Sequence, residues 1–139
     1  MRTHLFILFI ILLSVSCTNS SEKVNEAGEK TLGITYCNYE KDVFIEKYVT
    51  EIEAIDFFKQ LPRRDKSFLT INITETEVIK FAWQTHNRQC LIEITDVENE
   101  KIYKQRYANY EQCIELIKTI FTGNIHKVSE FTSITIMSN

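Results

Sequence analysis

The sequence predicts an α+β domain in which two helices pack on one face of a four-stranded antiparallel sheet arranged as a meander. Three observations support this fold class. Three segments between residues 67 and 96 alternate apolar and polar side chains, as strands with one buried face do, and a fourth, more polar segment follows at 101–108. Short polar connections join these segments, which suits antiparallel hairpins. Two further segments carry apolar side chains at helical spacing, so each needs a surface to cover.

The first helix is expected to follow two extended segments, 31–40 and 41–50, whose β-branched and aromatic residues favour strand. Thr50 and Glu53 have the spacing of a capping box, in which each side chain satisfies a backbone N–H of the first turn, so the helix should begin directly after Thr50. Pro62 should end it, because proline restricts the residue that precedes it. The expected apolar stripe of this helix consists of Ile52, Ile55, Phe58 and Leu61.

The parity of side chains along the strands predicts which face of the sheet is buried. Trp83 is the one tryptophan, and its parity with Ile79 and Phe81 places it in the core rather than in a binding site. The segment 101–108 is more polar and is expected near a sheet edge. The side chains expected on the inner face of the other three strands are Leu69, Ile71, Ile73, Ile79, Phe81, Trp83, Cys90, Ile92 and Ile94.

The second helix is expected between Asn109 and Gly123. Asn109 caps its start, with Gln112 three places later, and Gly123 suits the left-handed conformation that often follows a helix. The segment 131–139, rich in Thr and Ile, is expected to add a last strand. The expected apolar face of the helix consists of Cys113, Ile114, Ile117, Ile120 and Phe121.

The chain begins with the plan of a secretory signal peptide over residues 1–16. One Arg precedes an unbroken apolar run, and small residues follow it. The run is shorter than the roughly 20 apolar residues that a membrane-spanning helix needs. Residues 17–30 are then expected to be a lipidated cysteine and a flexible polar tether, and residues 31–139 a single α+β domain.

Two kinds of processing at Cys17 remain open from the residues. The sequence "SVSC" with the polar stretch after it resembles the lipobox of bacterial lipoproteins, and the composition suits those of Bacteroidetes. This resemblance implies cleavage before Cys17, fatty acyl chains such as palmitate on it, and an anchor in a membrane of the cell envelope, on the periplasmic side or at the cell surface. Alternatively, Ser14 and Ser16 mark an ordinary signal-peptidase site, which would leave Cys17 as a free thiol.

Cysteine parity depends on that choice. If Cys17 is lipidated, three cysteines remain, so at least one is unpaired; otherwise two disulfides can form in an oxidising compartment. Cys90 and Cys113 are both expected to point inward. They are the candidate disulfide, although buried thiols that only fill core space suit the pattern equally well.

The sequence contains few residues in patterns that catalysis requires. Three scattered glycines do not form a phosphate-binding loop, no G-x-S-x-G motif occurs, and Cys and His show no short metal-ligand spacing. With a net charge of -3 and no basic cluster, a nucleic acid is not an expected partner. We therefore predict no enzyme activity, no cofactor and no metal, and expect a protein partner instead.

The outer face of the sheet is the expected contact for that partner, because helices should cover only the inner face. The order of elements in residues 50–123 is similar to that of small α+β immunity proteins, which neutralise toxins of competing bacteria. This resemblance implies a toxin as partner and inhibition by occlusion, through the outer face or an edge strand. The alternative is a structural or accessory envelope lipoprotein of an assembly or transport system. The candidate contact residues are Asn72, Lys80, Gln84, Glu93, Lys104 and Arg106.

Overall fold

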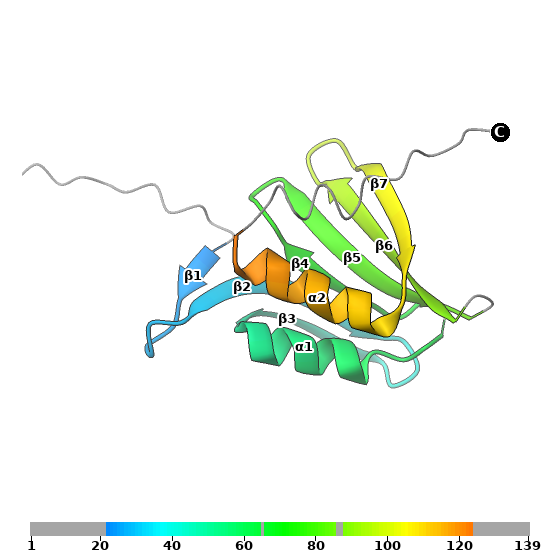
Figure 1. The fold of residues 1–139 in the computed structure, drawn as a ribbon, viewed down its shortest axis with the longest axis horizontal. Coiled ribbons are helices and arrows are strands. Elements are labelled where there is room, and N and C mark those ends of the chain that lie inside the picture. Colours follow the sequence, from blue (N-terminus) through cyan, green and yellow to red (C-terminus); the bar gives the residue numbers. More distant parts are fainter. Residues whose placement is uncertain (1–21, 65, 86–87, 124–139) are drawn as a thin grey trace, which may run out of the picture.

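In the computed structural model, two helices lie side by side across one face of an antiparallel sheet (Figure 1). The structure describes residues 22–64, 66–85 and 88–123. The predicted α+β class with two helices is confirmed. In chain order the elements are β1 (Glu22–Val24), β2 (Lys30–Asn38), β3 (Val43–Val49), α1 (Glu51–Gln60), β4 (Phe68–Asn72), β5 (Glu77–Gln84), β6 (Gln89–Asp96), β7 (Lys101–Ala108) and α2 (Tyr110–Phe121).

The sheet contains seven strands within the described ranges, so the predicted count of four is wrong. The expected meander is present as β4, β5, β6 and β7, each antiparallel to the next. The sheet continues because β2 pairs with β4, and β3 and β1 both pair with β2. The segments that become β2 and β3 have the strand composition noted above and form a local hairpin, but the pairing of β2 with β4 is long-range and leaves no mark in local sequence.

The N-terminal strand β1 shortens the predicted tether of residues 17–30. β1 pairs with the start of β2, and an ion pair of 3.1 Å joins Glu22 to Lys30. The Thr31 hydroxyl also donates to the backbone carbonyl of Lys23 at 2.9 Å. Every side chain of β1 is exposed, so the sequence shows no apolar alternation that would predict this strand. Residues 1–21, with the predicted signal peptide and Cys17, and the expected strand in 131–139 lie outside the described residues.

Both helices begin where their capping boxes predict. The Thr50 side chain accepts a hydrogen bond from the backbone N–H of Glu53, and the Glu53 carboxylate accepts one from the N–H of Thr50. Asn109 and Gln112 form the same reciprocal pair at the start of α2. Gly123 follows α2 with a φ of 74°, as predicted.

The buried stripe of α1 differs from the predicted one. Ala54, Phe58 and Leu61 are buried, whereas Ile52 is 70% exposed. Successive residues of a helix lie about 100° apart around its axis, so a step of three residues falls about 60° short of a full turn. Three such steps place Ile52 on the opposite side of the helix from Leu61. Steps of four and three, as in Ala54 to Phe58 to Leu61, keep a stripe on one face.

The core lies between the inner face of the sheet and the two helices. Phe58 of α1 packs against Phe81 and Trp83 of β5, with ring centroids 5.7 Å apart in each pair. Trp83 is 3% exposed, so its predicted place in the core is confirmed. From α2 the buried side chains are Cys113, Leu116, Ile117, Ile120 and Phe121. Within the described part of the chain, neither helix is long and apolar enough to cross a membrane.

Candidate binding surfaces

The outer face of the sheet is defined by the strand register. Residues directly opposite each other in an antiparallel pair share a face. Lys80 of β5 is opposite Thr70 of β4 and Glu93 of β6, and all three have the parity opposite to the buried side chains. Both helices pack on the inner face, so this outer face is uncovered by any described helix (Figure 1).

One row of apolar side chains crosses this outer face from edge to edge. We call it the apolar row. Its two ends are prominent, because Phe44 is 62% exposed and Tyr107 is 47% exposed. Outward-facing positions of a half-buried sheet are ordinarily polar, so a continuous apolar row is unusual. In order across β3, β2, β4, β5, β6 and β7, the row consists of Phe44, Cys37, Phe68, Ala82, Leu91 and Tyr107.

A second row, which we call the polar row, runs beside the first. At its centre the Glu93 carboxylate accepts a hydrogen bond from Gln105 Nε2 at 2.7 Å and lies 3.6 Å from Lys80 Nζ. Glu93 is only 8% exposed, so these contacts fix a largely desolvated carboxylate in place. The polar row consists of Glu46, Thr35, Thr70, Lys80, Glu93 and Gln105.

Four of the six predicted contact residues lie on the outer face. Asn72, Lys80, Gln84 and Glu93 have the predicted orientation. Asn72 also lies against Gly33, where a Cβ atom would come within 2.8 Å of the Asn72 side-chain nitrogen. A side chain at position 33 would therefore disturb this part of the face.

The placement of Lys104 and Arg106 on the outer face is wrong. They are opposite Ile94 and Ile92, whose side chains are in the core, so they belong to the inner face at the β7 edge. The register shifts between Ile94 and Thr95. This shift turns Ile102, opposite Thr95, to the outer face, whereas Lys104 and Arg106 keep the inward parity of Ala108.

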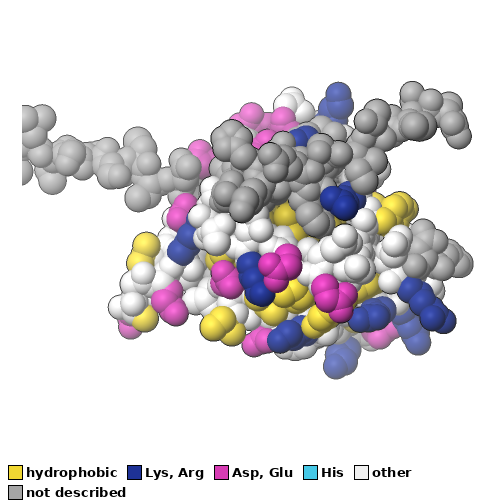
Figure 2. Space-filling view, in the orientation of Figure 1, with side chains coloured by type: hydrophobic (Ala, Val, Ile, Leu, Met, Phe, Trp, Pro, Cys, Tyr) yellow, Lys and Arg dark blue, Asp and Glu magenta, His cyan; other side chains and the backbone are white. Residues whose placement is uncertain are grey.

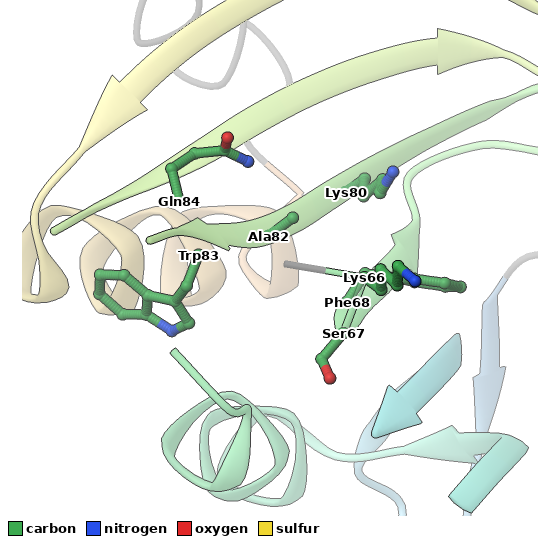
Figure 3. Close-up of a pocket in the computed structure, with 7 residues that line it drawn as sticks. All are labelled: Lys66, Ser67, Phe68, Lys80, Ala82, Trp83 and Gln84. Carbon is green, nitrogen blue, oxygen red and sulfur yellow. The ribbon is translucent and has the colours of Figure 1, made fainter. Parts of the chain in front are cut away.

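A shallow pocket of about 240 Å³ opens beside the apolar row. Lys80 Nζ lies 5.4 Å from the centre of the Phe68 ring. Figure 3 shows Gln84 and Trp83 leaving β5 in opposite directions, which separates the outer face from the core. The pocket is lined by Lys66, Ser67, Phe68, Lys80, Ala82, Trp83 and Gln84.

A second pocket of about 350 Å³, which we call the edge hollow, lies between α1 and the β2–β3 hairpin. The Tyr36 hydroxyl donates to the carbonyl of Gln60 at 3.2 Å and accepts from Asn38 Nδ2 at 3.4 Å. The Phe57 and Tyr36 ring centres are 5.1 Å apart. The edge hollow is lined by Tyr36, Asn38, Lys41, Val43, Ile45, Phe57 and Gln60.

Cysteine and charged side chains complete the inventory. Cys90 and Cys113 are free, buried thiols, whereas Cys37 is half-buried in the apolar row. A hydrogen bond with Cys90 raises the pKa of Cys113 far above its ordinary value, and burial acts in the same direction. Figure 2 shows the helix-bearing face, where several Lys and Arg side chains gather at one end and others lie among the acidic side chains.

Within residues 22–64, 66–85 and 88–123, no three His, Cys, Asp or Glu side chains form a group that could hold a metal ion. The apolar row and the edge hollow were both missed from sequence. Leu91 and Ala82 had the outward parity that would have revealed the row, but the hollow depends on how α1 sits beside β3. No family model, curated protein or solved structure matches this chain.

Proposed function

We propose that this protein is a non-enzymatic lipoprotein, anchored in the bacterial cell envelope through Cys17, that binds another protein through the outer face of its sheet, with a toxin as the candidate partner. The observation that carries the proposal is the apolar row on an uncovered face. Contiguous apolar side chains rimmed by polar ones are typical of protein interaction sites. Aromatic residues, such as Phe44 and Tyr107 at the ends of the row, are enriched in interfaces.

The two rows have different parts in this proposal. The apolar row supplies area that leaves water when the partner binds. The polar row supplies selectivity, because Glu93 and Lys80 lie at its centre with defined partners and would favour a complementary charge pattern. As an immunity protein, the chain would act by covering a functional surface of the toxin, and this requires no chemistry of its own.

The binding half of the proposal is tested with the toxin encoded by a neighbouring gene. Cells that express this toxin should grow when they also express the wild-type protein. Replacing Leu91, which lies in the apolar row between Ala82 and Tyr107, as Leu91→Glu, should weaken binding by about 30-fold or more, the loss of about 2 kcal/mol that marks an interface hot spot. Titration calorimetry with the two purified proteins measures this change.

Ile52→Glu is the matched control, because Ile52 is exposed and apolar but lies on α1, away from the outer face. It should bind like the wild type. Equal affinity for the toxin in wild type, Leu91→Glu and Ile52→Glu would refute the outer face as the contact. Growth inhibition that the wild-type protein does not relieve would refute the immunity role.

The anchor half of the proposal rests on the sequence around Cys17 and is tested separately. The intact mass of the mature protein from the membrane fraction should correspond to a chain that begins at Cys17 and carries acyl groups. A Cys17→Ser variant should be released from the membrane. An unmodified chain in the soluble fraction would contradict the anchor while leaving the binding proposal intact.

A further inference from the structure

Charged side chains are distributed unevenly between the two ends of the sheet. The antiparallel order places the α1–β4 connection, 61–67, and the β5–β6 turn, 85–88, at one end, which we call the basic end. The turns 73–76 and 97–100 lie at the other end and carry only acidic charges, Glu75, Glu98 and Glu100. The charged residues of the two basic-end segments are Arg63, Arg64, Lys66 and Arg88, with one acid, Asp65, which lies outside the described residues.

The basic end is also the end remote from the proposed anchor. β1, which follows the chain from Cys17, pairs with the first residues of β2 and so lies at the opposite end. The β2–β3 turn at the basic end adds Glu40, Lys41 and Asp42, and Glu40 already pairs with Arg64 at 3.0 Å. The basic end therefore keeps positive charge although the chain has a net charge of -3.

The pocket beside the apolar row lies at the basic end, on the outer face. We call it the lysine pocket, because Lys66 and Lys80 line it, while Phe68 and Ala82 of the apolar row supply an apolar wall. Figure 3 shows Lys80, Ala82 and Gln84 in succession along β5. The volume of about 240 Å³ suits a single side chain of a partner protein.

The polar groups of the lysine pocket keep hydrogen-bond donors that the protein itself does not use. Lys66 Nζ lies 4.7 Å from the centre of the Tyr39 ring, and it pairs with no carboxylate in the described part of the chain. Lys80 Nζ lies 3.6 Å from the Glu93 carboxylate, which is longer than a hydrogen bond, so its three N–H donors remain available. The Gln84 amide makes no hydrogen bond to another described residue. Such a pocket fits an anion.

The backbone does not account for a lysine at position 66. Its φ of 77° lies in the left-handed region, where glycine is favoured over residues with a side chain. Arg88, at the same end, has a φ of 51°. Glycine would relieve the strain at both positions, so the fold gains nothing from these long basic side chains. Their positive charge is what distinguishes them from the residues that the backbone favours.

We propose that the lysine pocket receives the carboxylate of an Asp or Glu side chain of the partner protein, while an apolar neighbour of that acid packs on Phe68. A lysine ammonium acts as a point charge that binds a carboxylate without a fixed orientation, so a shallow pocket suffices. Because the pocket lies on the outer face, this role rests on the proposed function, and it makes the partner's contact surface acidic. Complementary charge speeds association and disfavours partners with basic surfaces.

The test is a nuclear magnetic resonance titration of the full mature chain in a nonionic detergent. The probe is the peptide acetyl-Ala-Glu-Leu-amide, and the matched peptide with Gln in place of Glu has a similar shape without the charge. The Glu peptide should shift the backbone amide signals of Phe68 and Ala82 and the side-chain amide signals of Gln84, with a Kd of about 1 mM. The Gln peptide should bind about fivefold more weakly, since exposed ion pairs contribute up to about this factor.

Variants of Lys66 make the test specific. Lys66→Glu should weaken the Glu peptide about tenfold, because attraction becomes repulsion. Lys66→Gly suits the left-handed backbone, so it preserves the fold, and it should weaken the Glu peptide about threefold. Lys66→Arg keeps the charge and should bind within about twofold of the wild type. Lys118→Glu is the matched control: it changes the net charge equally at an exposed lysine of α2 and should leave the affinity unchanged.

Three results would overturn the proposed role of the lysine pocket. The first is equal affinity for the Glu and Gln peptides. The second is a loss of affinity in Lys118→Glu as large as in Lys66→Glu, which would assign the effect to net charge. The third is inorganic phosphate that shifts the same signals at a lower Kd than the Glu peptide, which would assign the pocket to phosphate groups.

Failure of the proposed function would give a different result. A toxin that binds wild type and Leu91→Glu equally would refute the outer face as its contact, while discrimination between the two peptides would still assign the pocket to carboxylates. A toxin whose affinity falls in Leu91→Glu but not in Lys66→Glu would leave the proposed function intact and refute the role of the pocket in it.

Discussion

The two faces of this sheet are built from the same strands but have opposite organisation. On the inner face the central strands are apolar and pack against Phe58 of α1 and Ile117 of α2, while Lys104 and Arg106 lie at the β7 edge. On the outer face, apolar and polar rows alternate, with Phe44 exposed at one end and Glu93 largely buried at the centre. The inner face thus has the composition that folding requires, while the outer face keeps apolar area that folding does not use.

The largest expected contrast is in thiol reactivity. Cys37 on the outer face should react with a small alkylating reagent under native conditions, whereas Cys90 and Cys113 require unfolding and should react about a thousandfold more slowly. Peptide mapping of the labelled protein measures each rate.

The same labelling tests the predicted Cys90–Cys113 disulfide. Both thiols are free in the structure, so the disulfide stays a prediction for the exported protein. Protein isolated from the envelope is denatured and alkylated without reductant. If the bond forms after export, these two cysteines should stay unlabelled until reductant is added. Labelling of both before reduction would show that they remain thiols that only fill the core.

Truncating an aromatic side chain should affect stability on one face only. Phe58→Ala removes a ring that contacts Phe81 and Trp83, and it should cost about 3–5 kcal/mol of unfolding free energy. Phe44→Ala on the outer face should cost less than about 1 kcal/mol. Urea denaturation of the two variants measures both effects. Equal losses would mean that the apolar row is structural rather than available for binding.

Removing the N-terminal cap of α1, a helix that covers the inner face, should have an intermediate effect on the free energy of unfolding. Thr50→Ala removes the acceptor for the Glu53 N–H and should cost about 1 kcal/mol. Asn109→Ala tests the equivalent cap of α2 and should cost a similar amount. Loss of less than a few tenths of a kcal/mol in both variants would show that packing alone holds the helices on the sheet.

The same cap predicts a small pH dependence. A hydrogen bond from the Thr50 N–H lowers the pKa of Glu53 below its ordinary value of 4.5. A lowered pKa means that the ionised form stabilises the folded state fully above that ordinary value, and that this stabilisation is lost as pH falls through the lowered pKa. Glu53→Gln should therefore remove part of the difference in unfolding free energy between neutral pH and about pH 3. An identical pH profile in wild type and variant would contradict this role.

The smallest expected effect concerns the polar row. Lys80 is half-exposed and its ion pair with Glu93 measures 3.6 Å, so a double-mutant cycle with Lys80→Met and Glu93→Gln should give a coupling of about 0.5 kcal/mol. A coupling above about 2 kcal/mol would mean that the polar row stabilises the fold strongly, which would weaken its assignment to selectivity.

Local signals in the sequence predicted the fold well where the relevant interactions are local. The two capping boxes placed both helix starts, and the parity of Trp83 with its neighbours placed it in the core. The inclusion of β2 and β3 in the same sheet was not predictable in this way, because β2 pairs with β4 across the whole of α1. β1 carries only exposed side chains and gave no pattern at all.

The candidate surface was predicted less well, for reasons that single residues make clear. Glu93 and Lys80 were placed correctly because unbroken alternation connects them to buried neighbours. Lys104 and Arg106 were placed on the wrong face because Ile102 and Tyr107 of this segment have opposite parities, so alternation alone did not fix its orientation. The apolar row requires the register of six strands together, and the edge hollow requires the position of α1, so neither is contained in any one segment.

The pairing of β1 with β2 limits how far the domain can stand above a bilayer. With Cys17 as the anchor, as proposed, the chain from Cys17 to Glu22 reaches at most about 18 Å, whereas a free tether up to Lys30 would have reached roughly 45 Å. The domain would then be confined close to the lipid headgroups, with a restricted range of tilts. A large partner would have to approach along the membrane plane rather than from above, and toxins that act at or cross that membrane would meet the protein first.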